Sequence, residues 1–403
     1  MLQFYSSSNS VVNSKRAMAE CIENALEGQG NLHCDLLIFY TTMGHNFKDL
    51  LSEARRLSPK AEIVGCTGMG VIGREGPNES MRALAIMAIK GEKNRFAVAT
   101  KDSIINADSF EIAAEMAKEL KTKNPGITMI HFLPSLDIVA ERAIEGFEAV
   151  FGPEVTLFGA ITCDNLKNIT NFQFYNERVL ERGAVAIGFA DQELEIITKA
   201  NHGFETIGSP FEVTKAEFPF ILEFNSQPAW RVLTDRLGFP ETANPMEVGL
   251  LAQFAEKLPD PLHEEYGSKH IIRGLFFGKE EDGRLLTPYP GICQKGKELW
   301  LTRRDEGGIF KGVDRLLKQI IEGIGDRKPL AVFHADCLLR GRLSLNKVLK
   351  DEIINRIQHP LRKDKDVPWV GLYGMGEYAK LGGRNRFHLC TTSLFVILER
   401  ARS

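Results

Sequence analysis

Side chains that could take part in binding or catalysis gather where apolar runs of this sequence end in turns. In open α/β sheets, ligands bind beyond the carboxyl ends of the strands, so such positions are candidate ligand contacts. They fall into three groups along the chain. The first holds His45, Cys66 and Thr67, the second Ser135, Asp164 and Asn165, and the third His334, Cys337, Arg340, Tyr373 and Glu377.

Two charged residues of the third group suit a small polar ligand. Arg340 carries a planar guanidinium that can bind a carboxylate through two parallel hydrogen bonds. Glu377 would supply the second charged contact, directly after a glycine-rich turn. We therefore predict a ligand site, whose members are Cys66, Thr67, Gly68, Cys337, Arg340, Tyr373, Glu377 and His388.

The cysteines allow a different interpretation. Cys66 or Cys337 could act as a nucleophile if His334 or His388 lay beside it as a base. This chemistry requires a thiol whose pKa is lowered by its surroundings. The alternative is that each is a small, buried thiol within the core. The sequence alone leaves both readings open.

Two histidines occupy matching positions just after predicted strands. His45 follows the first group's strand and His334 ends the strand of the third. A neutral imidazole at such a place could ligate haem iron, which makes both residues metal-ligand candidates and haem a candidate cofactor. The alternative is that each histidine caps its turn by hydrogen bonding.

Length and composition exclude several classes of protein. A chain of 403 residues exceeds one ordinary core and predicts about two domains. With 50 basic and 53 acidic residues, it lacks the positive charge of a nucleic-acid binder. No stretch reaches the roughly 18 to 20 apolar residues of a membrane span, and no signal-peptide pattern is present. Seven dispersed cysteines indicate reduced thiols, so we expect a cytoplasmic protein.

A glycine-rich stretch occurs twice, at residues 64–70 and 370–376, with a looser copy at 155–162. Neither full copy is a P-loop, because no Gly-Lys-Ser/Thr follows it. A strand rather than a helix is predicted after residue 70, so the stretch is not a dinucleotide fingerprint either. The two full copies instead predict matched strand ends that could face a shared cleft.

These stretches belong to a unit that is used three times. The first unit has a strand at 34–40, a helix at 47–57 and a strand at 82–89 after the glycine turn. The second has a strand at 127–133, a helix at 137–151, and a predicted hairpin of 169–175 with 183–189. The third has a strand at 329–334, a helix reaching 357, and a last strand at 388–398.

The fold class that follows is α/β, with α+β mixing, in which repeated strand-helix-strand-strand units form mixed sheets. Between the second and third units the pattern changes, and further strands are predicted at 211–216, 220–224, 271–277 and 285–287. We therefore expect two domains, at residues 1–208 and 209–403.

With these residues assembled, the chain resembles the FIST family (F-box and intracellular signal transduction proteins). The N-terminal FIST domain is matched by residues 35–40, 44–45, 157–160 and 183–186, and by Gly-Cys-Thr-Gly-Met-Gly at 65–70. The C-terminal FIST domain is matched by residues 221–225, 228–229, 333–340 and 388–391, and by Gly-Leu-Tyr-Gly-Met-Gly-Glu at 371–377. Two positions depart from the family pattern: Val71, where many relatives carry an acid, and Leu389-Cys390, in place of the more usual Asn-Gln.

The resemblance implies a non-enzymatic sensory module that binds small molecules such as amino acids. It also implies an alternative, because some stand-alone bacterial FIST proteins bind haem and sense nitric oxide. The partner would be a separate signalling protein, such as a histidine kinase or a cyclic-di-GMP enzyme, with no nucleic acid and no membrane involved. A cysteine-dependent enzyme is the alternative from another class.

Overall fold

The computed structural model describes residues 1–165, 169–274, 278–279, 281–287, 289–341, 344–362 and 366–401. They divide into two compact units, of which unit 1 comprises Met1–Ala200 with Val313–Ser403 and unit 2 comprises Asn201–Gly312. The fold is mixed α/β, as the sequence predicts. The predicted domain boundary after residue 208 stays a prediction, because the compact units describe packing rather than family domains.

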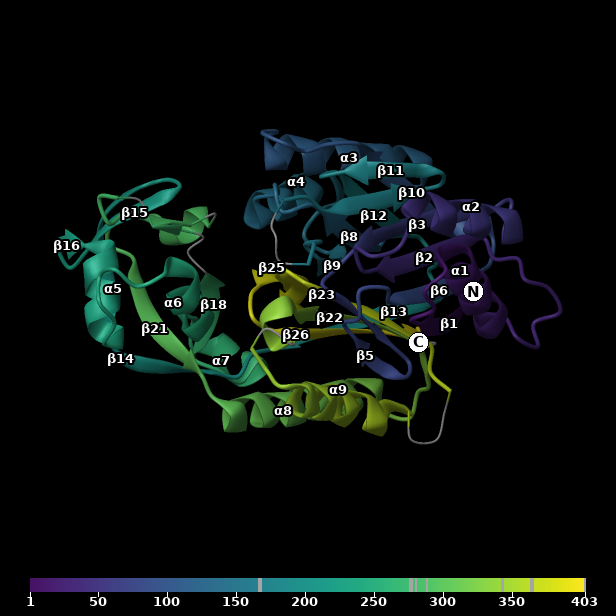
Figure 1. The fold of residues 1–403 in the computed structure, drawn as a ribbon. Helices are drawn as coiled ribbons and strands as arrows, with labels where there is room; N and C mark the ends of the chain where they lie inside the picture. The colour runs from purple at the N-terminus through teal and green to yellow at the C-terminus, as the bar shows by residue number, and fades with distance from the viewer. Residues whose placement is uncertain are drawn as a thin grey trace. The chain divides into compact units, whose positions relative to one another are not determined.

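Unit 1 is built from one repeat used three times, in the order strand, helix, strand, helix and then four strands (Figure 1). Repeat 1 contains β1 Gln3–Asn9, α1 Ser14–Ala25, β2 Leu36–Thr41, α2 Phe47–Leu57, β3 Glu62–Thr67, β4 Gly70–Gly73, β5 Gly76–Asn78 and β6 Leu84–Lys90. Repeat 2 contains β7 Phe96–Lys101, α3 Ser109–Lys123, β8 Met129–Pro134, α4 Ala140–Phe151, β9 Thr156–Ala160, β10 Phe172–Tyr175, β11 Arg178–Glu181 and β12 Ala184–Phe189. Repeat 3 contains β13 Leu194–Asn201, α8 Glu306–Ile324, β22 Pro329–Cys337, α9 Lys347–Arg362, β23 Trp369–Gly374, β24 Glu377–Leu381, β25 Arg384–His388 and β26 Thr392–Glu399.

Each repeat lends a hairpin to a neighbouring sheet. The sheet orders are β1-β6-β2-β3-β10-β11, β7-β12-β8-β9-β24-β25 and β13-β26-β22-β23-β4-β5. In every sheet the first four strands come from one repeat and the last two from another. The strand pair in the middle is parallel and the others are antiparallel where the register is resolved. The exchange is cyclic, so all three repeats depend on one another for complete sheets.

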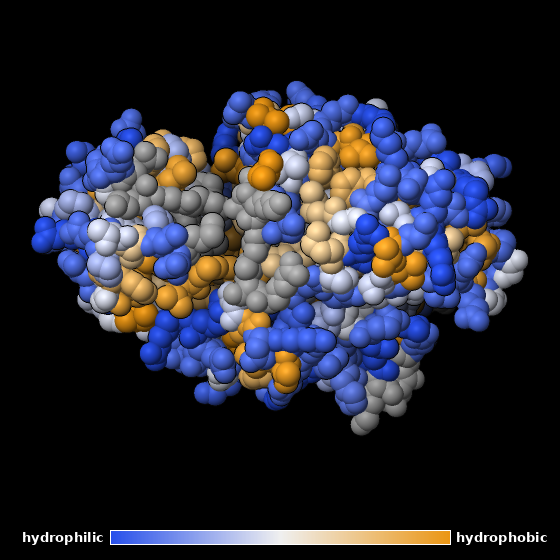
Figure 2. Space-filling view, in the orientation of Figure 1, coloured by the Kyte–Doolittle hydropathy of each residue, from blue (hydrophilic) through white to orange (hydrophobic). Residues whose placement is uncertain are grey.

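The sheets are covered on one face and pack together on the other. Buried apolar residues from β2, β8 and β22 join those of neighbouring strands in one inner core. A second core lies between α1, α2 and the outer face of the β1–β11 sheet. The ion pair of Arg356 with Asp314 links α8 to α9, at 2.6 Å between Nε and Oδ1. Outward-facing residues in the view of Figure 2 are mainly hydrophilic.

The glycine shared by the three copies serves the packing of strands. A Cβ atom on Gly65, Gly159 or Gly371 would lie 2.3, 2.4 or 2.4 Å from the carbonyl oxygen opposite it. These carbonyls belong to the adjacent parallel strands β2, β8 and β22. The glycines therefore allow the backbones of adjacent parallel strands to approach closely.

Unit 2 is an eight-stranded sheet with three helices in its described part, inserted between β13 and the third repeat's first helix. Its strand order is β18-β17-β21-β14-β15-β20-β19, and β16 pairs with β15. Its elements are β14 Phe204–Glu217, β15 Phe220–Phe224, β16 Gln227–Pro228, α5 Ala229–Leu237, α6 Pro245–Leu251, β17 Ala252–Lys257, α7 Pro261–Tyr266, β18 His270–Gly274, β19 Gly278–Lys279, β20 Leu285–Leu286 and β21 Glu298–Arg304.

The structure differs from the sequence prediction in how one pair of strands is paired. The predicted hairpin of 169–175 with 183–189 is wrong, because β10 pairs with β11 and the turn that joins them begins at Asn176. Residues Ala184–Phe189 form β12, which lies between β7 and β8. Asn176 adopts φ 55°, which allows a tight turn directly after Tyr175. The predicted strand at 271–277 is confirmed up to Gly274, and residues 275–277 lie outside the described part.

Candidate functional site

The three glycine-rich turns meet in unit 1. The backbone N–H of Met69 donates to the carbonyl of Tyr373 at 3.1 Å, so the first and last turns are neighbours. The N–H of Met375 donates to Ile161 at 2.9 Å, and that of Ile161 to Gly376 at 3.1 Å. The predicted proximity of the two full copies is therefore confirmed. Direct backbone hydrogen bonds, however, join them where the sequence suggested a cleft between them.

Because the hairpin exchange is cyclic, each repeat has the same set of three positions near its glycine-rich turn, which we call its setting. The three settings hold different residues. In each repeat, one residue of the exchanged hairpin pairs with the residue that follows the shared glycine of the neighbouring sheet. Two further equivalent positions lie at the end of each repeat's own parallel strand pair. They are the second residue after the shared glycine and the residue opposite it on the adjacent strand. These positions hold Val71, Thr41 and Thr67 in repeat 1, Gln173, Pro134 and Ile161 in repeat 2, and Glu377, Asp336 and Tyr373 in repeat 3. Only the last setting is ionisable at every position.

We call Asp336, Arg340, Tyr373 and Glu377 the third-repeat cluster. The 3-10 turn Leu338–Arg340 follows β22 directly, which returns the guanidinium of Arg340 to Asp336. Its Nε lies 2.7 Å from Asp336 Oδ1, and the two side chains are 3% and 1% exposed. The hydroxyl of Thr391 donates to Glu377 Oε2 at 2.5 Å. All of these side chains are buried.

Four polar atoms of the cluster have no hydrogen-bond partner within the described part of the chain. They are Asp336 Oδ2, Arg340 Nη2, the Tyr373 hydroxyl and Glu377 Oε1. Each buried, unsatisfied polar group costs roughly 1 to 3 kcal/mol of stability, and charged groups cost more. This concentration of unsatisfied buried atoms makes the third-repeat cluster the candidate binding site.

Burial also sets the protonation of the cluster. It raises the pKa of Asp336 to about 6, against the opposing effect of Arg340. Burial raises the pKa of Glu377 well above its usual value, and the neighbouring Cys337 and Asp336 add to the shift. It likewise keeps the Tyr373 phenol protonated by raising its pKa. Burial and the neighbouring acidic groups therefore favour the protonated form of Glu377.

The other predicted contacts lie nearby but have partners of their own. The hydroxyl of Thr67 accepts from the Phe172 N–H at 3.0 Å, across the junction of β3 and β10. Gly68 packs against the backbone of Tyr373. His388 is paired with Glu377 in the β24–β25 register, and its Nε2 is 3.2 Å from the Ala379 carbonyl. We infer that these residues shape the walls of the site.

The buried thiols do not have the properties of nucleophiles. A hydrogen bond with the Cys390 thiol and burial both raise the pKa of Cys337 well above its usual value. Burial does the same for Cys66. A reactive cysteine needs the opposite shift, because the thiolate is the attacking species. The geometry favours the interpretation of both as buried core thiols.

The surroundings of the two candidate histidines do not fit a haem. His334 is enclosed, with Nε2 2.9 Å from the Thr392 hydroxyl and the ring packed edge-on against Trp369. His45 lies beside a hollow of about 750 Å³, but its Nδ1 contacts the Ser14 hydroxyl at 3.1 Å and its Nε2 is buried. Most side chains around that hollow are polar, whereas the porphyrin faces need apolar contacts. We therefore assign neither histidine to haem.

Sequence reasoning missed one pair beside the cluster. Lys350 Nζ lies 2.5 Å from Glu79 Oε2, and both side chains are buried. Glu79 follows the hairpin that repeat 1 lends to the sheet of repeat 3, so nothing local in the sequence places it there. The available signal for the cluster lies in the two Gly-Met-Gly copies. When they are aligned, Val71 in the first copy corresponds to the acid Glu377 in the second.

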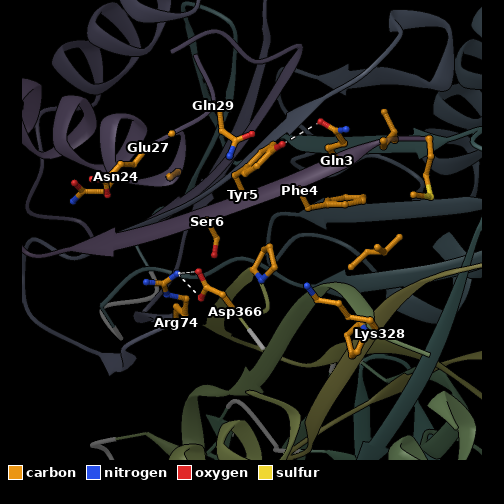
Figure 3. Close-up of a pocket in the computed structure, with 17 residues that line it drawn as sticks. Gln3, Phe4, Tyr5, Ser6, Asn24, Glu27, Gln29, Arg74, Lys328 and Asp366 are labelled. Carbon is orange, nitrogen blue, oxygen red and sulfur yellow. Dashed lines mark hydrogen bonds and ion pairs between the residues drawn. The ribbon is translucent and has the colours of Figure 1, made fainter. Parts of the chain in front are cut away.

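A separate groove of about 710 Å³ runs along β1 (Figure 3). Arg74 and Asp366 point toward one another in it, with Nη1 2.6 Å from Oδ1. It contains none of the residues singled out above. Gln3, Lys328 and most other polar side chains along it are exposed, so water can satisfy them.

Comparison with known proteins identifies the class of the molecule as the sensory domains of signal transduction. The chain belongs to the FIST family, because residues 35–227 match the FIST N domain and residues 229–380 match the FIST C domain. No curated protein matches the chain. No helix in the described residues combines the length and apolar character required to cross a bilayer.

Solved structures with related arrangements are distant. A cyanuric acid hydrolase from A. caulinodans has 8% identity and a TM-score of 0.38, with all of both chains covered. A second cyanuric acid hydrolase has 9% identity and a TM-score of 0.35, covering 99% of this chain and 100% of that one. A chorismatase has 10% identity and a TM-score of 0.35, covering 99% of each. At these TM-scores, the activities of these enzymes carry no argument for this chain.

Proposed function

We propose that this chain is a non-enzymatic sensory protein that binds a small carboxylate-bearing ligand, such as an amino acid, at the third-repeat cluster. The observation that carries the proposal is the set of four buried polar atoms without partners. Arg340 Nη2 would donate to the ligand carboxylate, and Tyr373 would donate from its hydroxyl. Ligand binding would thereby satisfy groups that are costly to leave unpaired.

The output follows from the fold and the family. The cluster draws its residues from β22 with the turn that follows it, from β23 and from β24, and β24 belongs to a different sheet from β22 and β23. A ligand that bridges them would favour one arrangement of the sheets over another and shift the population between the two. A separate signalling protein, such as a histidine kinase or a cyclic-di-GMP enzyme, would read this change.

The experiment that tests the proposal measures melting temperature against a panel of the common L-amino acids and their deaminated carboxylic acids. Wild type should be stabilised by at least one compound. Tyr373→Phe should lose most of that stabilisation, because it removes one donor from the site. Tyr378→Phe is the matched control, since its hydroxyl is also buried and unpartnered but lies outside the cluster. No stabilisation by any compound, or an equal loss in both variants, would contradict the proposal.

The haem alternative has a separate test. The absorption spectrum of the purified, haem-supplemented protein should show no Soret band from a specific, stoichiometric complex. A stoichiometric band that disappears in His45→Ala would overturn the assignment above and move the sensory site to repeat 1.

A further inference from the structure

Among the described residues, the buried charged groups around the third-repeat cluster do not balance. The carboxyl groups there are those of Glu79, Asp336 and Glu377, and the cations are those of Arg340 and Lys350. Lys350 pairs with Glu79 at 2.5 Å and Arg340 pairs with Asp336 at 2.7 Å. Glu377 is left without a cation of its own.

Hydrogen bonding leaves one oxygen of Glu377 free in the described part of the chain. Oε2 accepts from Thr391, whereas Oε1 has no partner. The side chain is fully buried, so bulk solvent does not reach that oxygen. The titratable and charged groups around it are Asp336 and Cys337 at the end of β22, Arg340 in the following turn, His388 opposite it on β25, and Cys390 before β26.

We propose that Glu377 Oε1 receives a cationic nitrogen of the ligand and that binding releases one proton to solvent. This inference rests on the proposed function and adds to it a second recognised group and a coupling to pH. Unliganded, the buried carboxyl is neutral and keeps its proton. When an ammonium group arrives, the carboxyl ionises, its proton leaves to bulk water, and the ammonium keeps its own protons.

The sign of the coupling follows from this balance. Affinity should rise with pH wherever unliganded Glu377 is protonated, by up to about tenfold per pH unit. A carboxylate-only ligand, which brings no cation to Glu377, should show no such dependence from this group. The pH slope therefore reports on the amine contact separately from the contact with Arg340.

Repeat 2 offers a natural precedent for the variant that tests this. Gln173 occupies the position equivalent to Glu377, and its Oε1 accepts from the Gly183 N–H at 2.7 Å. Glu377→Gln keeps the size of the side chain and an acceptor for Thr391, so the variant should fold. A urea unfolding curve verifies this before binding is measured.

The binding experiment is calorimetry of wild type and Glu377→Gln between pH 6 and pH 8, in two buffers that differ in ionisation enthalpy. The probes are the L-amino acids and, for each, the carboxylic acid that lacks the amino group. Wild type should bind an amino acid with release of one proton. Glu377→Gln should bind it more weakly and without proton release, and the deaminated acid should release none.

Other outcomes separate this inference from the proposed function. If an amino acid and its deaminated acid bind with equal affinity and no proton release, the inference falls and the proposed function stands. The same holds if only carboxylic acids bind. If no probe binds wild type, both fall. Infrared spectroscopy adds a ligand-independent arm: a protonated-carboxyl band present at pH 7 in wild type should be absent in Glu377→Gln, and a wild type without it contradicts the inference.

Discussion

Tyr40 and His131 form the most informative polar pair of the inner core. The tyrosine hydroxyl lies 2.6 Å from His131 Nε2, and both residues are buried. His131 Nδ1 has no partner in the described part of the chain, and the ring packs against Phe158 at 4.6 Å and Phe333 at 5.2 Å. Tyr40→Phe would therefore remove the hydrogen bond of His131 Nε2.

The expected cost is that of one buried polar group left unsatisfied, about 1 to 3 kcal/mol of unfolding free energy. His131→Phe should recover much of this in the Tyr40→Phe background, since the equivalent position of repeat 3 is Phe333 and accepts an aromatic ring. The double variant should then be more stable than the sum of the single changes predicts.

The assay is urea unfolding of wild type, both single variants and the double variant, followed by tryptophan fluorescence and circular dichroism. Tyr378→Phe is the control, because its hydroxyl already lacks a partner and should be lost at little cost. If Tyr40→Phe costs no more than Tyr378→Phe, or if the coupling energy is zero, the hydrogen bond between Tyr40 and His131 does not stabilise the core.

Three further predictions concern stability. Burial lowers the pKa of His131 to about 3, so the native state binds fewer protons than the unfolded state. Unfolding free energy should therefore fall as pH drops below about 6.5 toward 3, and His131→Phe should flatten that slope in urea titrations. Lys350→Met removes a buried cation that pairs with Glu79 and should cost about 3 to 5 kcal/mol, and an equal loss in Lys350→Arg would refute a role for charge. Gly374→Ala puts a Cβ atom 2.8 Å from a backbone carbonyl and should lower the melting temperature, whereas Gly126→Ala, which meets only side-chain atoms at 3.3 Å or more, should not.

The repeated glycine-rich stretch was the part of the fold that sequence could predict. Its glycine fits only where two parallel strands approach closely, so the motif marks the same place in each repeat. Long apolar strands such as β2 and β8 were found for a related reason, because burial on both faces leaves an unbroken apolar run. Both signals are local in the sequence, so neither depends on how distant parts of the chain fold.

The exchanged hairpins could not be found in that way. β4 and β5 have four and three residues, too few to show a period-two pattern. Their sheet partners come from another repeat, and no local preference specifies that choice. This is why Glu79 was missed and why β12 was paired with the wrong strand. The insertion of unit 2 was hidden similarly, since β13 and α8 lie about a hundred residues apart in sequence.

The three equivalent settings allow function to be separated from folding. Val71 and Gln173 occupy the same backbone position as Glu377 without a charge, so this setting folds with an apolar or an amide side chain. A buried carboxyl there costs stability that neither alternative would cost. Arg340 offsets this cost only in part, because it and Lys350 form their ion pairs with other carboxyl groups. An acid that folding does not require and that the surrounding charges leave unpaired is best explained by a group that binds to it.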